Sequence, residues 1–334
     1  MRKAMRLDER LDRIIDLLVH HRTVIVSGSK IAQEIGTTGK QVWRLIQLLR
    51  RLGVDIEGRP ATGYVLRTSP DLLLPSILAP LLRGTIFQTE LHHYYKIGST
   101  NVAAMNAAAE GVSEGTVFLA EEQTAGRGRG GHSWFSARGA GIYCSAVLKP
   151  ALAPADSLLI SLATALAVHD AVEEVKPDNT DLQLDLKWPN DLLVRGKKFC
   201  GILTEMNAEP TRVRHLVVGI GINVNHGRFP AELEAQATSL CLETGSAWSR
   251  VDLTAALLKS VHREYRQLLS GGHKSVLSRF CSLSSMVRGV PVYVEENGGF
   301  QGVTEGLDAR GFLQVRMDHG LKTVLSGTVR PLKD

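Results

Sequence analysis

A glycine-rich segment with two arginines, residues 126–133, constrains this chain more than any other feature. It reads Gly-Arg-Gly-Arg-Gly-Gly-His-Ser and is followed by Trp134. Glycines let the backbone approach a ligand closely, and arginines together with backbone amides bind anions. The segment predicts a binding loop for a phosphate-containing ligand. A basic surface loop without a ligand is the alternative that this segment alone leaves open.

Two common phosphate-binding motifs share part of this pattern but do not fit it. The glycines at 126, 128 and 131 have the spacing of the dinucleotide fingerprint, yet that motif should follow its strand directly, and the apolar run Thr116–Ala120 ends six residues upstream. Residues 126–133 are also one residue short of a P-loop. His132 stands where the P-loop requires lysine, so we set both motifs aside.

A second motif, Lys187-Trp-Pro-Asn-Asp191, lies further along the chain. It follows an alternating run over 182–186 and precedes an apolar run, a tight turn at Arg195-Gly196 and a second strand over 199–203. The predicted hairpin gathers Lys187, Asn190, Asp191 and Lys198 near one turn. Such a group of side chains is suited to binding a nucleotide and a carboxylate.

With these motifs the chain resembles biotin protein ligases of the bifunctional bacterial type, which is also the repressor of the biotin operon. The resemblance covers essentially the whole chain. It is carried, in sequence order, by Ser99-Thr100-Asn101, Gln123-Thr-Ala-Gly-Arg-Gly-Arg129, Trp134-Phe-Ser136, Lys187-Trp-Pro-Asn-Asp-Leu192, Lys198-x-x-Gly201-Ile-Leu203-x-Glu205 and Gly219-x-Gly221-Ile-Asn223.

The resemblance implies a reaction in two steps. Biotin and MgATP give biotinyl-5′-AMP and pyrophosphate, and a lysine of a biotin carboxyl-carrier protein domain then attacks the mixed anhydride. Mg²⁺ enters with ATP, and we expect no fixed metal site. A carboxylate is already ionised at neutral pH, so adenylation needs positioning and positive charge rather than a general base.

The resemblance also implies site residues. Catalytic roles are expected for Arg129, Lys187, Lys198 and Asp191. Biotin contacts are expected from Ser99, Thr100, Asn101, Gln123, Gly126, Arg127, Gly128, Arg129 and Lys198. Contacts to the adenylate or ATP are expected from Trp134, Lys187, Asn190 and Asn223. Two alternatives stay open: residues 99–101 could cap the alanine-rich helix that follows them, and Trp134 could be a core residue.

The binding loop departs from the pattern of the family at three positions. Gly130 and His132 stand where family members commonly carry arginines, and Ser133 stands where lysine is frequent. Because the loop has fewer fixed charges, we expect it to bind the adenylate with lower affinity.

Residues 1–67 have the pattern of a winged helix-turn-helix. Apolar residues recur with helical spacing over 7–18 and 42–52, Ser27 can cap a helix over 28–35, and residues 54–66 suggest a hairpin. This segment has 13 lysines and arginines against 7 aspartates and glutamates, whereas the remainder has 26 against 27. An anionic partner of this domain is therefore expected.

In this fold the second helix of the motif enters the major groove of DNA. The candidate DNA contacts are Thr38, Lys40, Gln41, Arg44 and, in the wing, Arg59. Gly39, where family members usually carry arginine, weakens the start of the helix. A domain for protein interaction is the alternative.

The expected fold class is α+β, with three domains. They are a winged helix-turn-helix (1–67), a class II synthetase-like α/β catalytic domain (70–283) and an SH3-like β-barrel (285–334). The boundary is marked by Ser69-Pro70-Asp71. Strands expected at 116–120, 141–148, 182–203 and 215–224 outnumber helices at 158–175 and 252–269, and short strands with glycine turns follow residue 285.

Composition places the chain among ordinary globular proteins, with 44% apolar and 22% charged residues. The pairs His20-His21 and His92-His93 lack metal-site spacing, and we expect them to be solvated surface histidines. Residues 1–22 are heavily charged, and the longest apolar stretch, Leu158–Val168, is too short to cross a bilayer. We therefore expect a cytoplasmic protein without a membrane partner.

The sequence is compatible with four functions. The leading one is a biotin ligase that also represses transcription, with biotinyl-5′-AMP as corepressor and a ligand-promoted homodimer on operator DNA. The alternatives are a ligase whose N-terminal domain does not bind DNA, a ligand-sensing transcription factor without catalysis, and a lipoyl ligase. The presence of both Lys187 and Lys198 argues against the sensor. The joint occurrence of Gly-Arg-Gly-Arg and Lys-Trp-Pro-Asn-Asp argues against the lipoyl ligase.

Overall fold

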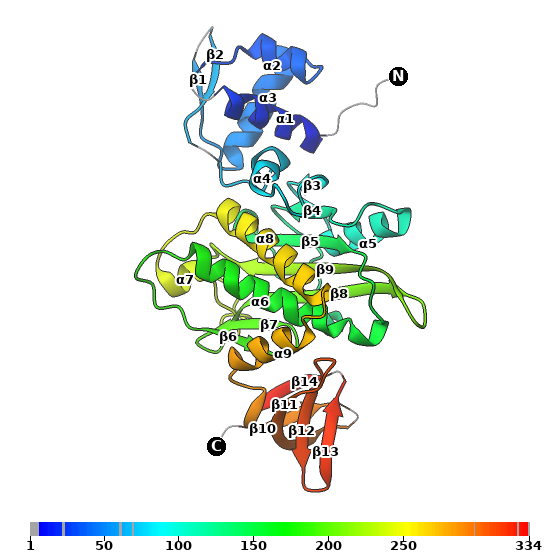
Figure 1. Cartoon of the computed structure of the whole chain (residues 1–334). Coiled ribbons are helices and arrows are strands. Elements are labelled where there is room, and N and C mark those ends of the chain that lie inside the picture. Colours follow the sequence, from blue (N-terminus) through cyan, green and yellow to red (C-terminus); the bar gives the residue numbers. More distant parts are fainter. Residues whose placement is uncertain are drawn as a thin grey trace.

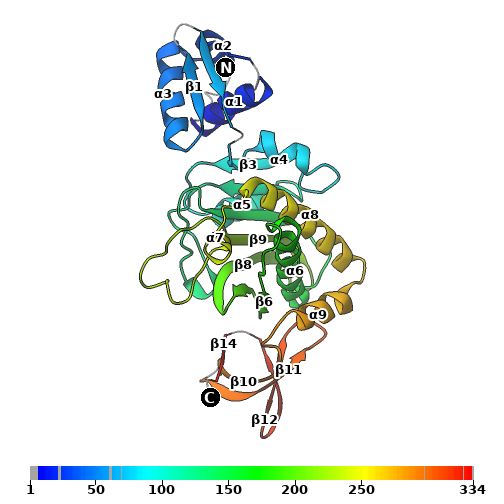
Figure 2. The same ribbon diagram turned by 90° about the vertical axis from the view of Figure 1, so that its left-hand side faces the viewer.

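The computed structural model describes residues 7–21, 24–59, 62–68, 70–296, 298–325 and 327–332, so Ser69 of the expected boundary lies outside the described residues. Three parts are stacked along one axis: helices with a hairpin at the N-terminal end, a large sheet with helices on both faces, and a small sheet at the C-terminal end (Figures 1 and 2). One hydrophobic cluster fills the N-terminal part and extends to Leu72, Leu74 and Tyr95 of the central part, and a second, continuous cluster spans the central and C-terminal parts.

The N-terminal part has the arrangement expected of a winged helix-turn-helix. Its elements are α1 (Leu7–His20), α2 (Gly28–Glu34), α3 (Gly39–Arg51), β1 (Ile56–Arg59) and β2 (Gly63–Leu66). Ser27 Oγ accepts a hydrogen bond from the Lys30 N–H at 3.2 Å, and Thr38 Oγ1 accepts one from the Gln41 N–H at 3.4 Å. These caps satisfy free N–H groups at the starts of α2 and α3, so the start of each helix is determined locally.

The central part is a seven-stranded mixed sheet with the order β3-β4-β5-β9-β8-β7-β6. Its strands are β3 (Leu91–Tyr94), β4 (Val117–Ala120), β5 (Gly141–Leu148), β6 (Leu184–Lys187), β7 (Asp191–Val194), β8 (Lys197–Ala208) and β9 (Val213–Asn223). Only the pair β3–β4 is parallel among the described strands. Hairpins and adjacent antiparallel strands dominate, which confirms an α+β fold.

Helices cover both faces of this sheet (Figure 2). α5 (Thr100–Glu110) packs on one face, while α6 (Leu158–Val175) and α8 (Arg250–Leu269) pack together on the other. The shorter helices of this part are α4 (Pro75–Leu81), α7 (Leu240–Thr244) and α9 (His273–Ser282). The strands between these layers are buried on both sides, which explains the nearly continuous apolar runs of β5 and β9.

Helix α6 accounts for the most apolar segment of the chain. By length and composition alone, Pro154–Val175 could cross a membrane, so the expectation drawn from Leu158–Val168 is too strict. Within the fold, 67% of its most apolar stretch is buried, and α6 packs against α8 and against β7 and β8 of the sheet. Burial in the protein core accounts for its composition.

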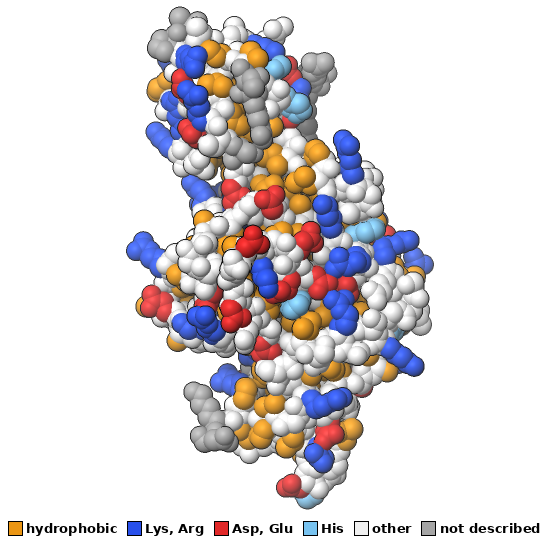
Figure 3. Space-filling model, turned by 60° about the vertical axis from the view of Figure 1, so that its left-hand side comes forward, with side chains coloured by type: hydrophobic (Ala, Val, Ile, Leu, Met, Phe, Trp, Pro, Cys, Tyr) orange, Lys and Arg blue, Asp and Glu red, His pale blue; other side chains and the backbone are white. Residues whose placement is uncertain are grey.

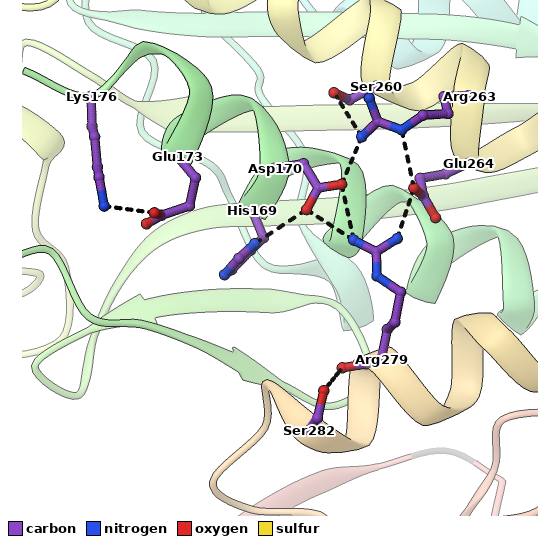
Figure 4. Close-up of polar contacts among 9 residues, drawn as sticks. All are labelled: His169, Asp170, Glu173, Lys176, Ser260, Arg263, Glu264, Arg279 and Ser282. Carbon is purple, nitrogen blue, oxygen red and sulfur yellow. Dashed lines mark hydrogen bonds and ion pairs between the residues drawn. The ribbon is translucent and has the colours of Figure 1, made fainter.

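An ion-pair cluster joins α6, α8 and α9 (Figure 4). The guanidinium of Arg279 donates to Asp170 at 2.9 Å and to Glu264 at 2.8 Å, and Arg263 donates to Asp170 at 2.6 Å. Burial alone would raise the pKa of Asp170, but hydrogen bonds from His169 and Arg279 lower it to about 2. The cluster ties α9, from which the chain leaves for the C-terminal sheet, to the central helices.

A second network of charged side chains, the junction network, lies where α1 meets the central part. His93 on β3 lies 3.2 Å from Asp12 of α1 and 3.2 Å from Glu121, and Arg250 contacts Glu121 at 2.7 Å and Asp71 at 3.0 Å. Burial would lower the pKa of His93, but the hydrogen bonds that its ring donates to both carboxylates raise it to about 9.

The expectation that His93 is a solvated surface residue is therefore wrong. Its side chain is fully buried and lies between the carboxylates of Asp12, on α1, and Glu121. His20, by contrast, is exposed.

The C-terminal part is a five-stranded antiparallel sheet with the order β13-β12-β11-β10-β14. Its strands are β10 (Arg288–Glu295), β11 (Phe300–Leu307), β12 (Leu313–Met317), β13 (Gly320–Val324) and β14 (Thr328–Pro331). The indole N–H of Trp188, in the Lys-Trp-Pro-Asn-Asp motif, donates to the carbonyl of Gly311 at 2.8 Å. This bond joins the C-terminal part directly to the segment that the sequence marks as functional.

Candidate active site

A cavity lies on the central sheet where the sequence motifs converge. Its walls come from β5, β8, β9, the start of α5 and the loop over residues 126–133. The residues lining it are Ser99, Thr100, Asn101, Gln123, Arg127, Gly128, Arg129, Trp134, Tyr143, Cys144, Ser145, Asn190, Lys198, Gly201, Ile202, Leu203, Gly219, Ile220 and Gly221. Most of the residues expected to bind biotin thus lie around one space.

Three glycines of the strands form the floor of the cavity. A Cβ atom at Gly219 would lie 2.0 Å from the side-chain oxygen of Asn101, and one at Gly221 would lie 2.6 Å from the indole of Trp134. A Cβ atom at Gly201 would lie 2.9 Å from both Trp134 and Lys198. Because these side chains lie directly on the strands, only glycine fits beneath them. This packing explains the spaced glycines of the last two motifs.

One end of the cavity is polar. The backbone N–H and the hydroxyl of Thr100 donate to Gln123 Oε1 at 2.8 and 3.1 Å, and Asn101 Nδ2 donates to Glu205 at 2.8 Å. Ser145 Oγ lies 2.8 Å from the Thr100 hydroxyl and 2.6 Å from the Asn101 side-chain oxygen. The linked donors and acceptors can recognise a small polar head group of a ligand.

Both structural alternatives for these motifs fail. Ser99 occupies the N-cap position of α5, but its side chain makes no capping hydrogen bond. Trp134 is only partly buried and borders the cavity, where its indole nitrogen has no hydrogen-bond partner. Ser99 and Trp134 both line the cavity.

The other end of the cavity is cationic. Arg127, Arg129 and Lys198 line it, and the lining residues include no carboxylate. Lys198 Nζ lies 2.6 Å from Asp191 and 5.2 Å from the centre of the Trp134 ring. Burial lowers the pKa of Arg129 from its ordinary value, and its guanidinium donates to the carbonyl of Gly327 at 3.2 Å. This excess of positive charge favours an anionic ligand.

The loop that carries the arginines is folded back on itself. The Gly128 N–H donates to the carbonyl of His132 at 2.6 Å, and Arg127 pairs with Ser133 in an antiparallel bridge. Gly130 has φ 67°, in the left-handed region that favours glycine. The glycine at 130, where the family commonly has arginine, is thus suited to the turn.

Four expected site residues do not line the cavity. Gly126 is in the loop but packs beneath the Trp134 backbone, and Asp191 reaches the cavity only through Lys198. Asn223 is buried and donates to the carbonyl of Thr238 at 3.1 Å. Lys187 lies opposite Asp191 in the β6–β7 register, outside the cavity wall.

Sequence reasoning missed Tyr143, Cys144 and Ser145 of β5. All three line the cavity, and Ser145 connects Thr100 with Asn101. The one signal for Ser145 is a polar residue inside a strand whose other residues are apolar or glycine.

Comparisons with known proteins agree with this geometry. The model of the biotin/lipoate A/B protein ligase family matches residues 95–223. The bifunctional ligase/repressor BirA of Bacillus subtilis (strain 168) is 33% identical, with 98% of this chain and 99% of that protein covered. This chain belongs to the bifunctional biotin ligase/repressor family. The family member of the same name from Escherichia coli (strain K12) is 28% identical over 91% of this chain and 92% of that one.

A solved structure of the family has the same catalytic fold. It is the biotin protein ligase from Aquifex aeolicus in complex with biotin and ATP, with a TM-score of 0.63 and 30% identity. The match covers 73% of this chain and 100% of that chain.

The N-terminal part matches a model described as an HTH domain, over residues 10–65. Thr38 caps α3, and Lys40, Gln41 and Arg44 are exposed on that helix. Arg59 is exposed in the hairpin and pairs with Glu57 at 3.0 Å. Lysine and arginine side chains are visible on this end of the molecule, beside a few acidic ones (Figure 3). The helix-turn-helix of this family member therefore presents a polar, basic helix face to solvent.

Proposed function

We propose that this protein is an ATP-dependent biotin protein ligase that forms biotinyl-5′-AMP and transfers biotin to a lysine of a carrier domain. The observation that carries the proposal is the cavity itself, which is polar at one end, has three cations at the other and has no carboxylate in its wall. In the first step a biotin carboxylate oxygen bonds to the α-phosphorus of ATP and pyrophosphate leaves. In the second, a lysine amine bonds to the acyl carbon, AMP leaves and the amine loses a proton.

The residues divide between the two ends of the substrate. Ser99, Thr100, Asn101 and Gln123 bind the ureido ring, and the backbone of Gly126 and Gly128 lets the loop close over it. Lys198 binds the carboxylate, which replaces Asp191 as its partner, while Arg127 and Arg129 stabilise the phosphoryl oxygens. The adenosine and phosphates are assigned to Trp134, Asn190, Asn223 and Lys187.

Catalysis in this proposal depends on charge and alignment. The biotin carboxylate is ionised at neutral pH, so no residue has to remove a proton in the first step. Preorganised cations stabilise charge that develops at the phosphorus, and each such contact contributes about 3–4 kcal/mol. Mg²⁺ arrives with ATP as part of the substrate. Asp191, once released from Lys198, orients the incoming lysine or contacts this Mg²⁺.

The N-terminal part, in this proposal, makes the ligase a repressor of biotin genes. Thr38, Lys40, Gln41, Arg44 and Arg59 contact operator DNA, and biotinyl-5′-AMP acts as corepressor by promoting a homodimer. The protein acts in the cytoplasm. Its domains are the winged helix-turn-helix 1–67, the catalytic domain 70–283 and an SH3-like barrel 285–334.

Calorimetry tests the ligase directly. Biotin is titrated into the protein, ATP is then added, and mass spectrometry of the complex should find bound biotinyl-5′-AMP. Lipoate in a parallel titration should bind much more weakly. A preference for lipoate, or the absence of any adenylate, would contradict the assignment.

Gel shifts over a salt series on the protein's own biotin-gene promoter test the repressor. We expect a shift that strengthens when the adenylate is present. Arg44→Ala should weaken binding and flatten its salt dependence. A ligase that shifts no DNA at any salt concentration favours the ligase-only alternative.

A further inference from the structure

The outer face of α3 exposes a tryptophan, Trp43. Its exposed fraction is 56%, whereas Trp188 and Trp248 are 3% and 5% exposed. An indole in water forgoes the stabilisation that burial of a large aromatic side chain gives. The core of the N-terminal part is filled without it, because α3 buries Val42, Leu45, Ile46 and Leu49 on its other side. The indole of Trp43 therefore adds little to the stability of a fold whose core these four residues already fill.

The neighbours of Trp43 on this face are polar or basic. At 100° per residue, Lys40, Arg44 and Gln47 lie near the middle of the outer face, with Trp43 and Gln41 on its two flanks. The first turn of α3 has no acidic residue. This charge pattern complements a polyanion, with one apolar ring beside the cations.

The start of the helix is open. Side chains of a helix lean toward its N-terminus, so the indole of Trp43 is directed toward the first turn. Gly39 in that turn has no side chain, and a Cβ atom there would meet no other atom within 4 Å. A base-pair edge can therefore approach the backbone of this turn while the indole lies beside it.

We propose that Trp43 is a specificity-determining contact to duplex DNA, in which the indole packs against the methyl group of a thymine in the major groove. This inference rests on the proposed repressor function and adds the kind of base that the helix recognises. The thymine methyl is the apolar group that base pairs present in the major groove, and apolar side chains contact it there. The neighbouring Lys40 and Arg44 hold the phosphates while Trp43 discriminates between bases.

Binding to operator DNA that contains deoxyuridine tests this contact, because uracil differs from thymine only by the missing methyl. The full-length protein with biotin and MgATP is titrated against operator duplexes in which one thymine per half-site is replaced. We expect wild-type affinity to fall about threefold to tenfold at the contacted thymine, as for the loss of one modest base contact. Trp43→Ala should bind the thymine duplex correspondingly more weakly and lose its sensitivity to that replacement. Trp43→Phe should retain part of both.

The controls separate this contact from other roles. Val24→Ala changes another exposed apolar residue of the same part, which is 58% exposed, and should keep wild-type affinity and wild-type sensitivity to deoxyuridine. Pyrophosphate release should be unchanged in all variants.

Three outcomes would overturn the inference. If Trp43→Ala keeps wild-type affinity and sensitivity, the thymine contact is wrong although the repressor function stands. If Trp43→Ala instead weakens self-association in sedimentation, the indole contacts a second copy of the chain. If the wild-type protein binds no DNA, the repressor function fails and this inference fails with it.

Discussion

Charged side chains are concentrated in two regions of this protein. In one region opposite charges compensate each other, and in the other positive charge is left in excess. In the junction network, protonated His93 and Arg250 lie among the carboxylates of Asp12, Glu121 and Asp71, all within 3.2 Å of a partner. In the cavity, three cations line a wall that contains no carboxylate; Asp191 pairs with Lys198 from outside that wall, and Asp191 and Glu296 are the carboxylates near Arg129 among the described residues. The first region is neutralised by the protein itself, and the second is left with positive charge.

The difference shows how structural and functional charges can be told apart. Removing a charge from water costs several kcal/mol, and an ion pair offsets that cost only when its geometry is good. The junction network meets this condition and joins two parts of the fold. The cavity does not meet this condition, because its remaining positive charge is stabilised only when an anion binds. We infer that the cavity cations bind ligand, whereas the junction charges maintain the structure.

The largest expected effect on stability comes from breaking the junction network. Arg250→Ala leaves the buried carboxylate of Glu121 without its closest cation and should lower the free energy of unfolding by about 3–5 kcal/mol. Arg263→Ala removes a half-exposed cation and should cost less than about 1 kcal/mol. Urea denaturation measures both. Equal stabilities of the two variants would contradict a structural role for the network.

The largest expected effect on activity comes from the cavity. Lys198→Ala removes the cation that we assign to the biotin carboxylate and should slow adenylation by about 3–4 kcal/mol in activation free energy, or at least a hundredfold. Lys197→Ala is the matched control, because Lys197 is adjacent and exposed, does not line the cavity, and donates to the carbonyl of Glu234 at 3.1 Å. Pyrophosphate release at saturating substrate measures the rate. Wild-type turnover of Lys198→Ala would exclude its assigned role.

The pH dependence of stability should reveal the junction charges. His93 has its pKa raised from 6.5 to about 9, so its contribution is complete below pH 6.5 and is lost as pH rises toward 9. The pKa of Glu121 is lowered from 4.5 to about 2, because Arg250 and His93 outweigh its burial, so its contribution is lost as pH falls from 4.5 toward 2. Denaturation over pH 3–9.5 should show both declines. His93→Gln should remove the loss of stability at alkaline pH. If that variant loses stability at alkaline pH as the wild-type protein does, the pairing of His93 with Asp12 and Glu121 is disproved.

Local features of the structure were predictable from sequence. Ser27 caps α2 as expected, and α6 has the bounds that its apolar run predicts, whereas the cap that Thr38 provides for α3 was not predicted. The hairpin over 184–203 follows from turn residues between apolar runs. In the wing, the hairpin expected over residues 54–66 is present, but its first strand begins at Ile56 rather than at Val54 and continues to Arg59. These features depend on neighbours in the chain, which a sequence displays.

Other features depend on contacts across the fold. Arg250 and Glu121 are separated by 129 positions, and their ion pair forms only because α8 packs beside the end of β4. His93 is buried by α1, which lies far away in sequence. Ser145 enters the site through the register of β5 with its neighbours. Lys187 and Lys198 look equivalent in sequence, but only Lys198 lines the cavity.

A smaller effect is expected for retention of the intermediate. Arg129→Gly should leave adenylate synthesis largely intact but release biotinyl-5′-AMP faster, because the guanidinium no longer holds the phosphoryl group. Arg138→Ala, an exposed residue that pairs with Glu122, is the control. The escaped adenylate is detected as biotin on bystander proteins. Labelling of the carrier domain alone would contradict the role of Arg129.

The most direct test of the central claim compares biotin with its uncharged amide in calorimetry. If unpaired positive charge in the cavity selects an anion, the wild-type protein should bind biotin at least tenfold more tightly than the amide, since one charge-assisted contact is worth about 1.5–3 kcal/mol. Lys198→Ala should bind the two with nearly equal affinity. Equal binding of both ligands by the wild-type protein would contradict the claim that the cavity cations select an anionic ligand.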